Sequence, residues 1–396
     1  MNNIEIEKLI PGGQALGTLE NGKKIMLWGT LPGEIVTKVH VTKEKSSYCE
    51  GVAEENAKKS QYRIEPKDEC YLATSPWQIM TYEYELEQKF AILKEIYRQA
   101  KVDLSEITVS PVQTDGQDFH YRNKMEYALY YNHADEKIYP AFHGRGSHRK
   151  VPVVQSSLER SEIWQRATEI IDELNARGED ARKYQSLLLR CDQNGSVSGG
   201  LYENHKPHQE FTSLSDSIMG ETYTYSPNGF FQINLPVYEM ALREIKGWVK
   251  AGNVLDLYSG VGTIGLSVAR DKNLVLVECD KSAYRELEAN VEKVKLSSSS
   301  SVHITPILAK SEDALEYIAP DQTVIVDPPR AGCMPEVIAK FNATEPRTII
   351  YLSCNPVTQA RDISKLLDIY SIVSVTPYNF FPRTPHLENL VILEHK

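Results

Sequence analysis

The chain has 396 residues, of which 41% are apolar, and this length is sufficient for two or three domains with hydrophobic cores. Its formal net charge of -10 at pH 7, taken alone, argues against a nucleic-acid partner. No run of about 18 apolar residues occurs, so no membrane-spanning helix is expected. The six cysteines are scattered without C-x-x-C spacing, which predicts a cytoplasmic protein with neither a zinc site nor a disulfide framework.

Residues 1–57 predict a small N-terminal β-barrel domain. Short β-favouring runs, such as 24–27 and 39–41, alternate with turns at Asn21-Gly22 and Pro32-Gly33. Short strands at this spacing are typical of a small barrel. The polar stretch over 54–69 then predicts a connector.

Residues 58–225 predict a small central α+β domain. Apolar residues at helical spacing indicate a helix over 81–101, which is expected to pack on the C-terminal domain, and a second helix over about 158–176. Two segments, 119–142 and 186–203, have the pattern of hairpins.

The segment 119–150 is basic and aromatic, although the whole chain is acidic. It holds six Lys/Arg against three acids, together with four histidines and five tyrosines. Such a stripe is typical of a nucleic-acid surface, and Arg122 and Lys124 are its candidate RNA contacts. A solvated hairpin with tyrosines on its packed face is an equally weighted alternative.

Residues 226–396 predict an α/β domain with a doubly wound, mostly parallel sheet. Helices and apolar strands alternate strictly from about residue 234, and the chain ends with two strands near 371–376 and 388–394. A short helix is also expected near 311–318.

A strand followed by a glycine turn and a helix start predicts a cofactor site. The segment from Asp256 to Gly265 contains G-x-G-x-x-G, which begins at Gly260, and Glu278 ends the next strand 18 residues after Gly260. An acid at that place binds ribose hydroxyls. The motif fits both nicotinamide dinucleotides and S-adenosylmethionine, and Asp256 within the strand favours the methyl donor.

Two further strands deliver reactive side chains to the same predicted rim. Asp327 follows the fourth strand and is held by two prolines, a good arrangement for binding a polar ring. Cys354 follows the fifth strand in a turn made by Asn355 and Pro356, where a nucleophile would be exposed. A turn-forming Asp and a structural Cys are the alternatives.

With these residues placed, the chain resembles the family of S-adenosylmethionine-dependent RNA 5-methyluridine methyltransferases. The matching segments are Phe230-Phe-Gln-Ile-Asn234, Asp256-Leu-Tyr-Ser-Gly-Val-Gly-Thr263, Asp327-Pro-Pro-Arg330, Ser353-Cys-Asn-Pro356 and Phe381-Pro-Arg-Thr-Pro-His-Leu-Glu388. The N-terminal residues also look like a TRAM domain, an OB-like RNA-binding barrel found in many members. The resemblance implies a Rossmann-like class I methyltransferase domain.

The resemblance also implies roles for individual residues. Cys354 would be the nucleophile and Glu388 the base, and Phe230 would lie against the target base. Asp327 would contact the methyl donor and the uracil, and Arg330 would contact the ligand or RNA. The remaining cofactor positions are Gln232, Tyr258, Gly260, Thr263 and Glu278.

The chain departs from the family in two places. Ser259 stands where members often have Cys, a change expected to be silent. Many members hold an iron–sulfur cluster on four central cysteines, but only Cys70 stands in the matching stretch 70–78. We therefore predict S-adenosylmethionine as cofactor and no iron–sulfur cluster.

The predicted activity is methylation of carbon 5 of a uridine in structured RNA, with 23S rRNA as the expected substrate and the tRNA T-loop as the alternative. A monomer without membrane contact is expected. A dehydrogenase would leave Cys354 and the Asp327 motif unexplained, and cytosine methyltransferases favour a Pro-Cys or Thr-Cys context. A non-catalytic RNA-binding protein with a methyltransferase fold is the alternative from another class, and Cys354 and Glu388 argue against it.

Overall fold

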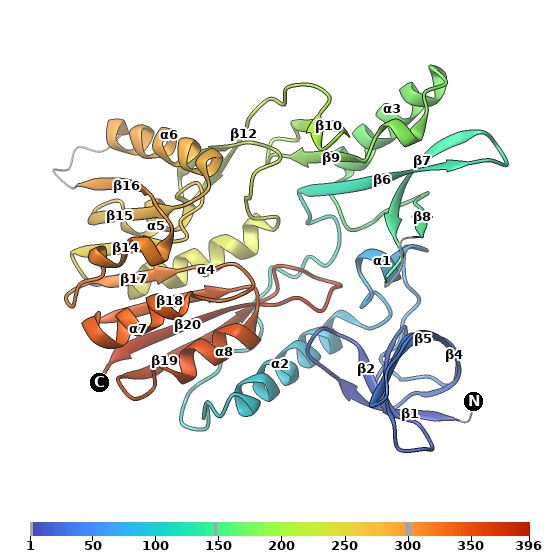
Figure 1. Cartoon of the computed structure of the whole chain (residues 1–396), viewed down its shortest axis with the longest axis horizontal. Coiled ribbons are helices and arrows are strands. Elements are labelled where there is room, and N and C mark those ends of the chain that lie inside the picture. The colour runs from blue at the N-terminus through green and yellow to red at the C-terminus, as the bar shows by residue number, and fades with distance from the viewer. Residues whose placement is uncertain (1–2, 146–148, 298–302) are drawn as a thin grey trace.

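The computed structural model describes residues 3–145, 149–297 and 303–396, arranged in three parts (Figure 1). A closed barrel lies at the N-terminal end, a twisted sheet with one long helix forms the middle, and a helix-covered sheet forms the C-terminal part. This confirms the predicted fold class. Within the described ranges no helix has the length and hydropathy needed to span a membrane.

Five strands close the N-terminal barrel in the order β1-β2-β3-β5-β4. They are β1 (Ile4–Leu9), β2 (Ala15–Thr18), β3 (Lys24–Trp28), β4 (Ile35–Glu44) and β5 (Tyr48–Lys58). The buried side chains of β1 are Ile4, Ile6 and Leu9, and their alternation with exposed ones breaks at the register shift between Ile6 and Lys8. Because β5 extends to Lys58, the first residues of the predicted 54–69 connector are strand.

The central part is a six-stranded sheet in the order β11-β10-β9-β6-β7-β8. Its strands are β6 (Lys124–Asn132), β7 (Lys137–His143), β8 (Lys150–Pro152), β9 (Ser186–Cys191), β10 (Val197–Glu203) and β11 (Lys206–Pro207). The helix α3 (Ser161–Ala176) buries Ile163, Ala167, Ile171 and Leu174 against it, a spacing that places them on one helix face. Both predicted hairpins are present, as β6–β7 and β9–β10.

The C-terminal sheet has seven strands in the order β16-β15-β14-β17-β18-β20-β19. They are β14 (Asn253–Leu257), β15 (Asn273–Glu278), β16 (Ile304–Leu308), β17 (Thr323–Val326), β18 (Thr348–Ser353), β19 (Tyr370–Tyr378) and β20 (Glu388–His395). Strands β14 to β18 are mutually parallel, whereas β20 runs antiparallel to both of its neighbours. The start of β20 therefore lies at the edge where the parallel strands end.

Helices cover both faces of this sheet. One apolar core contains side chains of α4 (Leu235–Trp248), α5 (Thr263–Ala269) and α6 (Lys281–Ser297). The opposite core contains side chains of α2 (Tyr82–Gln99), α7 (Pro335–Thr344) and α8 (Pro356–Ser364). Neighbouring strand residues alternate between the two cores, as doubly wound packing requires: Ile349 belongs to one and Ile350 to the other.

Two details differ from the sequence-based prediction. The short helix expected near 311–318 is a pair of 3-10 turns, Ser311–Asp313 and Leu315–Tyr317. The hairpin β12 (Leu214–Ile218) and β13 (Glu221–Tyr225) was not predicted, and it packs into the core of α4, α5 and α6. This apolar core thus includes residues before 226, where the sequence predicts the C-terminal domain to begin.

Candidate active site at the sheet edge

The nucleophile candidate Cys354 occupies the turn between β18 and α8. The Asn355 side chain accepts a hydrogen bond from the Val357 amide (3.3 Å) and caps α8, and Pro356 occupies the first helical position. The helix must therefore begin directly after the strand, which leaves Cys354 at the sheet edge. The sequence predicts an exposed thiol, whereas Cys354 is half-buried.

The base candidate Glu388 reaches the same edge from the reversed strand. It is the first residue of β20 and pairs with Tyr378, and the next residue, Asn389, pairs with Ser353 beside the cysteine. The Glu388 side chain is 3% exposed, and its Oε2 atom has no hydrogen-bond partner among the described residues. A buried carboxylate oxygen without a partner is available to accept a proton.

One cavity of about 560 Å³ collects most of the predicted site residues. It is lined by Phe230, Gln232, Tyr258, Gly260, Thr263, Glu278, Asp327, Arg330, Cys354 and Glu388. Arg122 and Lys124 do not line it, and they lie on the central part next to it. These residues lie up to 158 positions apart in the sequence, from Phe230 to Glu388, and the sheet edge brings them together.

The glycine turn between β14 and α5 is fixed by a buried acid. The Oδ2 atom of Asp256 accepts a hydrogen bond from the Gly265 amide at 2.8 Å, and burial raises the pKa of Asp256 to about 8. Gly262 has a φ of 87°, and a Cβ there would lie 2.6 Å from a Leu287 methyl carbon. Asp256 thus positions the turn from inside, and glycine is required at 262.

Glu278 closes the other side of the glycine turn. Its Oε2 atom accepts from the Gly260 amide at 2.8 Å, and its Oε1 atom accepts from the amides of the two following residues. Each carboxylate oxygen has a second lone pair, so Glu278 keeps the capacity to accept from a ligand hydroxyl.

Burial is the main cause that raises the pKa values of the reactive groups of the cavity. Burial raises the pKa of the Cys354 thiol to about 12, and the Glu388 and Asp327 carboxyls contribute, whereas Arg330 lowers it. Burial, followed by Asp327, raises the pKa of Glu388 well above its usual range. Burial also raises the pKa of Asp327 to about 7. A cationic ligand in this cavity would favour the ionised forms of these groups.

The loop before Glu388 is held by a buried ion pair on α2. Lys89 Nζ lies 2.9 Å from Glu85 Oε1, and both side chains are at most 1% exposed. Lys89 donates to Asn379 Oδ1 (2.5 Å) and to the Phe381 carbonyl (3.1 Å). Glu85 accepts from the Arg383 amide at 3.0 Å with each oxygen. Helix α2 thus positions the strand that carries the base.

The loop that carries Phe230 is held from the central part. Arg190 is 1% exposed, and it donates to the carbonyls of Gly229 (3.4 Å) and Phe231 (2.8 Å). Lys124 Nζ donates to the carbonyls of Asn228 (3.2 Å) and Gly229 (3.1 Å). Together they fix the backbone on both sides of Phe230, whose side chain is 72% exposed at the cavity mouth.

Replacing Phe230 with alanine is expected to lower kcat/KM for RNA about 10- to 100-fold, because an exposed ring beside the cavity can stack on a base. Folding stability should not change, because little of the ring is buried. Phe231→Ala is the matched contrast: its ring is 3% exposed and stacks on Tyr225, so about 3–5 kcal/mol of stability should be lost. Thermal unfolding together with RNA kinetics separates the two, and unchanged kinetics for Phe230→Ala would contradict a stacking role.

The sequence did not assign roles to Arg190, Lys89 and Glu85. A signal existed for Arg190, because it interrupts the apolar run of β9, and a buried guanidinium requires hydrogen-bond acceptors. Lys89 and Glu85 stand four residues apart in a helix, a spacing that solvent-exposed pairs share. Their burial depends on the Asn379–Arg383 loop, which is almost 300 residues away in the chain.

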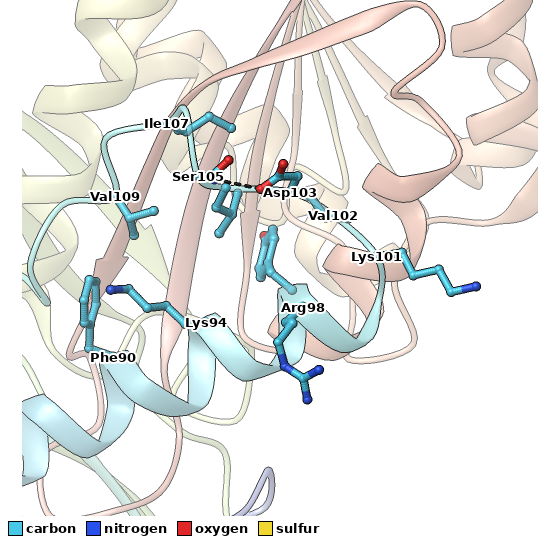
Figure 2. Close-up of a pocket in the computed structure, with 11 residues that line it drawn as sticks. Phe90, Lys94, Arg98, Lys101, Val102, Asp103, Ser105, Ile107 and Val109 are labelled. Atoms are coloured by element: carbon cyan, nitrogen blue, oxygen red, sulfur yellow. Dashed lines mark hydrogen bonds between the residues drawn. The ribbon is translucent and has the colours of Figure 1, made fainter.

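Another cavity, of about 650 Å³, lies where α2 ends (Figure 2). Its walls are largely apolar, and Lys94 lies with its Nζ atom 4.3 Å from the centre of the Phe90 ring. Figure 2 shows Arg98 and Lys101 extending outward, and Asp103 bonded to the Ser105 amide at 2.9 Å. No cysteine or unpaired carboxylate lines this cavity, so the sheet-edge cavity is the candidate active site.

Comparisons with known proteins agree with this geometry. A model of the tRNA (uracil-5-)-methyltransferase family matches residues 208–396. An uncharacterized RNA methyltransferase of Prochlorococcus marinus is 28% identical over 92% of this chain and 99% of its own length. One from Nanoarchaeum equitans is 36% identical over 50% of this chain and 42% of its own length.

A solved structure shares the fold along the whole chain. The Pyrococcus abyssi tRNA (uracil-54, C5)-methyltransferase in complex with S-adenosyl-L-homocysteine matches with a TM-score of 0.75, at 24% identity over 99% of this chain and 100% of that one. At this identity the likeness concerns the fold. Residues 208–396, which contain the lining of the cavity, therefore match the (uracil-5-)-methyltransferase family, and the protein is an S-adenosylmethionine-dependent RNA methyltransferase.

Proposed function

We propose that this protein transfers a methyl group to carbon 5 of a uridine in structured RNA through a covalent adduct between Cys354 and carbon 6 of the uracil. The observation that carries the proposal is the convergence of Cys354, Glu388 and Asp327 on the cavity that the glycine turn also lines. A dehydrogenase would leave the Asp327 motif and the closed N-terminal barrel unexplained.

The residues of the cavity fit S-adenosylmethionine. The glycine turn has no room for a Cβ at Gly262, and Ser259 Oγ is buried without a hydrogen-bond partner among the described residues. Gln232, Tyr258, Gly260, Thr263 and Glu278 would hold the cofactor, whose bound form supplies a methyl group and a sulfonium cation. The surrounding carboxyls complement that cation.

The protein's own groups account for the remaining chemistry. The Cys354 thiolate adds to carbon 6, so that the electron pair of the C5–C6 bond becomes available at carbon 5 for the methyl group. Asp327 orients the uracil, and the exposed ring of Phe230 supports a base that has left its stack. Glu388 then removes the proton from carbon 5, and the returning electron pair expels the thiolate.

Structured RNA is the proposed substrate class, with 23S rRNA as the first expectation and a tRNA T-loop uridine as the alternative. The closed N-terminal barrel and the basic stripe of 119–150 support an RNA partner, although residues 146–148 of that stripe lie outside the described residues. Phosphate contacts from such surfaces position RNA without reading its sequence. A monomeric state, a cytoplasmic location and the absence of an iron–sulfur cluster stay predictions.

The deciding experiment is methyl transfer from labelled S-adenosylmethionine to total RNA that lacks the modification. We expect the label in 5-methyluridine of one RNA size class after digestion to nucleosides, and the size class identifies rRNA or tRNA. If no RNA is labelled while the protein binds S-adenosylmethionine, the proposed methylation of RNA is wrong, and a non-catalytic RNA-binding role is favoured.

The affinity for S-adenosylmethionine should rise several-fold between about pH 6 and pH 7.5. Asp327 has a pKa of about 7, so it is largely protonated at the lower pH, and a cationic ligand favours its ionised form. Binding therefore releases a proton, and higher pH favours binding. S-adenosylhomocysteine lacks the sulfonium charge, so its affinity should change less over this range, as calorimetry can measure.

Asp327→Asn is the control for this pH dependence. Asparagine keeps the shape of the side chain and does not titrate, so the S-adenosylmethionine profile should become flatter than that of the wild type. Equal slopes for the two ligands in the wild type would contradict the charge argument.

A further inference from the structure

A small cavity of about 220 Å³ lies at the seam between the central sheet and the start of α4, and we name it the seam cavity. Its lining residues are Asp115, Gln117, His120, Tyr121, Asn123, Arg160, Cys191, Gln193, Ile233, Asn234, Leu235 and Pro236. Ile233 also lines the catalytic cavity, so the two spaces share this residue. Gln232 lines the catalytic cavity, and Asn234 lines the seam cavity two positions later.

The seam cavity contains amide groups without partners. Asn234 is fully buried, and neither its Oδ1 nor its Nδ2 atom has a hydrogen-bond partner among the described residues. Asn123 is 4% exposed, its Oδ1 atom is also unpaired, and its Nδ2 atom donates to the Gln232 carbonyl at 3.1 Å. An unsatisfied buried amide costs about 1–3 kcal/mol. A bound group that supplies the missing hydrogen-bond partners would offset this cost and explain the buried amides.

The local fold does not use the Asn234 side chain. Asn234 precedes α4 at the N-cap position, where an asparagine normally accepts from a helix amide, yet its side chain makes no capping hydrogen bond. The Asn234 carbonyl accepts from the Tyr238 amide at 3.1 Å, so the backbone alone begins the helix. The side chain therefore lies unpaired beside the seam cavity, whose lining includes Asn234.

The chemistry of these atoms matches the edge of a nucleobase. An asparagine amide presents an acceptor beside a donor, and this pattern reads bases by paired hydrogen bonds. The volume of the seam cavity, about 220 Å³, is smaller than the roughly 300–1,000 Å³ typical of sites for drug-sized ligands. A single planar base is a smaller ligand and needs a smaller site. The lining also includes the exposed His120 and Asp115, and the half-buried Arg160, which pairs with Glu162 at 2.6 Å.

We propose that the seam cavity holds a second nucleobase of the RNA substrate, close to the target uridine, and that Asn234 and Asn123 bind its donor–acceptor edge. This inference rests on the proposed function, because the second base belongs to the same RNA. Single-stranded loops are recognised by splaying bases into separate pockets, and the catalytic cavity and the seam cavity share the wall at Ile233.

The first test replaces Asn234 with leucine, which has nearly the same size and no polar atoms. We expect kcat/KM for the RNA to fall about 10- to 100-fold, the range for one bidentate base contact, with unchanged affinity for S-adenosylhomocysteine. The melting temperature should stay equal or rise, because an unpaired buried amide is removed. Asn194→Leu, on the exposed turn of the β9–β10 hairpin, is the matched control and should leave kcat/KM unchanged.

The second test locates the base. Each nucleotide around the methylated uridine is made abasic in turn, and RNA binding and kcat/KM are measured with the wild type and with Asn234→Leu. We expect one position at which the abasic change weakens the wild type but adds nothing in the variant, since both changes remove the same contact. Additive losses at every position would overturn the proposal.

The remaining outcomes separate the possible errors. Unchanged kcat/KM for Asn234→Leu with raised stability would mean that water satisfies the amides, and the proposal would fail while the proposed function stands. Lost affinity for S-adenosylhomocysteine would assign the seam cavity to the cofactor site and overturn the proposal. If the wild type methylates no RNA, the proposed function fails, and RNA binding that is equal for wild type and variant then overturns the second-base site as well.

Discussion

Replacing Cys354 with alanine is expected to lower methyl transfer by about 10⁴-fold or more, because the variant loses the group that activates carbon 5. Alanine removes only the sulfur, while Ser353 and Asn389 still pair beside it and Asn355 still caps α8. The affinity for S-adenosylhomocysteine should therefore stay within a few-fold of the wild type. The measurement is incorporation of labelled methyl into 5-methyluridine.

Cys279→Ala is the matched control for this prediction. Cys279 is an exposed thiol that follows β15 at the same sheet edge but does not line the catalytic cavity, and its variant should keep full activity. Turnover by Cys354→Ala within about tenfold of the wild type would rule out a covalent adduct, because a missing nucleophile costs far more.

The high pKa of Cys354 adds a condition to this mechanism. A thiol with a pKa of about 12 is protonated at neutral pH in the free protein, and Arg330 is the nearby side chain that lowers the value. The thiol becomes reactive once its proton leaves and the negative charge is balanced. Arg330 is exposed, and its carbonyl accepts from the Asn355 side chain at 2.8 Å, which ties its loop to that of the cysteine. Arg330 therefore places a positive charge near the Cys354 thiol, and its backbone helps to hold the loop of the cysteine in place.

The sequence predicted the C-terminal sheet closely because its signals are local. Each strand is an apolar run and each helix has its own spacing, so β18 and α8 could be placed within two residues at their starts. The gathering of Cys354, Glu388 and Asp327 followed from one rule, that loops beyond the carboxyl ends of parallel strands meet at one edge. Glu388 fits this rule because β20 is reversed.

The contacts between the parts could not be predicted in the same way. The Lys89–Glu85 pair and Arg190 form hydrogen bonds with backbone carbonyls and amides of distant segments. Backbone carbonyls occur at every position, so the residue types in the sequence do not reveal these contacts. The β12–β13 hairpin was not predicted, although a two-residue turn is a local feature of the chain. In the structure both turn residues, Met219 and Gly220, have positive φ, which is typical of a two-residue hairpin turn.

Replacing Glu388 with glutamine is expected to trap the protein on its RNA after the methyl group has been transferred. Glutamine keeps the shape of the side chain and the pairing with Tyr378, but it cannot accept the proton of carbon 5. The thiolate then has no electron pair to expel it, and turnover should fall about 10²- to 10⁴-fold. A methyl-labelled protein–RNA band that survives denaturing electrophoresis is the expected result.

The position of Glu388 makes this trapping specific. The carboxyl is buried and its Oε2 atom has no partner among the described residues, so no neighbouring group shares its proton by a hydrogen bond at that atom. The double variant Cys354→Ala with Glu388→Gln should form no band, because the adduct requires the sulfur. Normal turnover by Glu388→Gln would give the base role to another group, and the half-buried Asp327 would be the first to test. A variant that forms neither adduct nor product would show that Glu388 acts before methyl transfer, which contradicts a role confined to removing the proton.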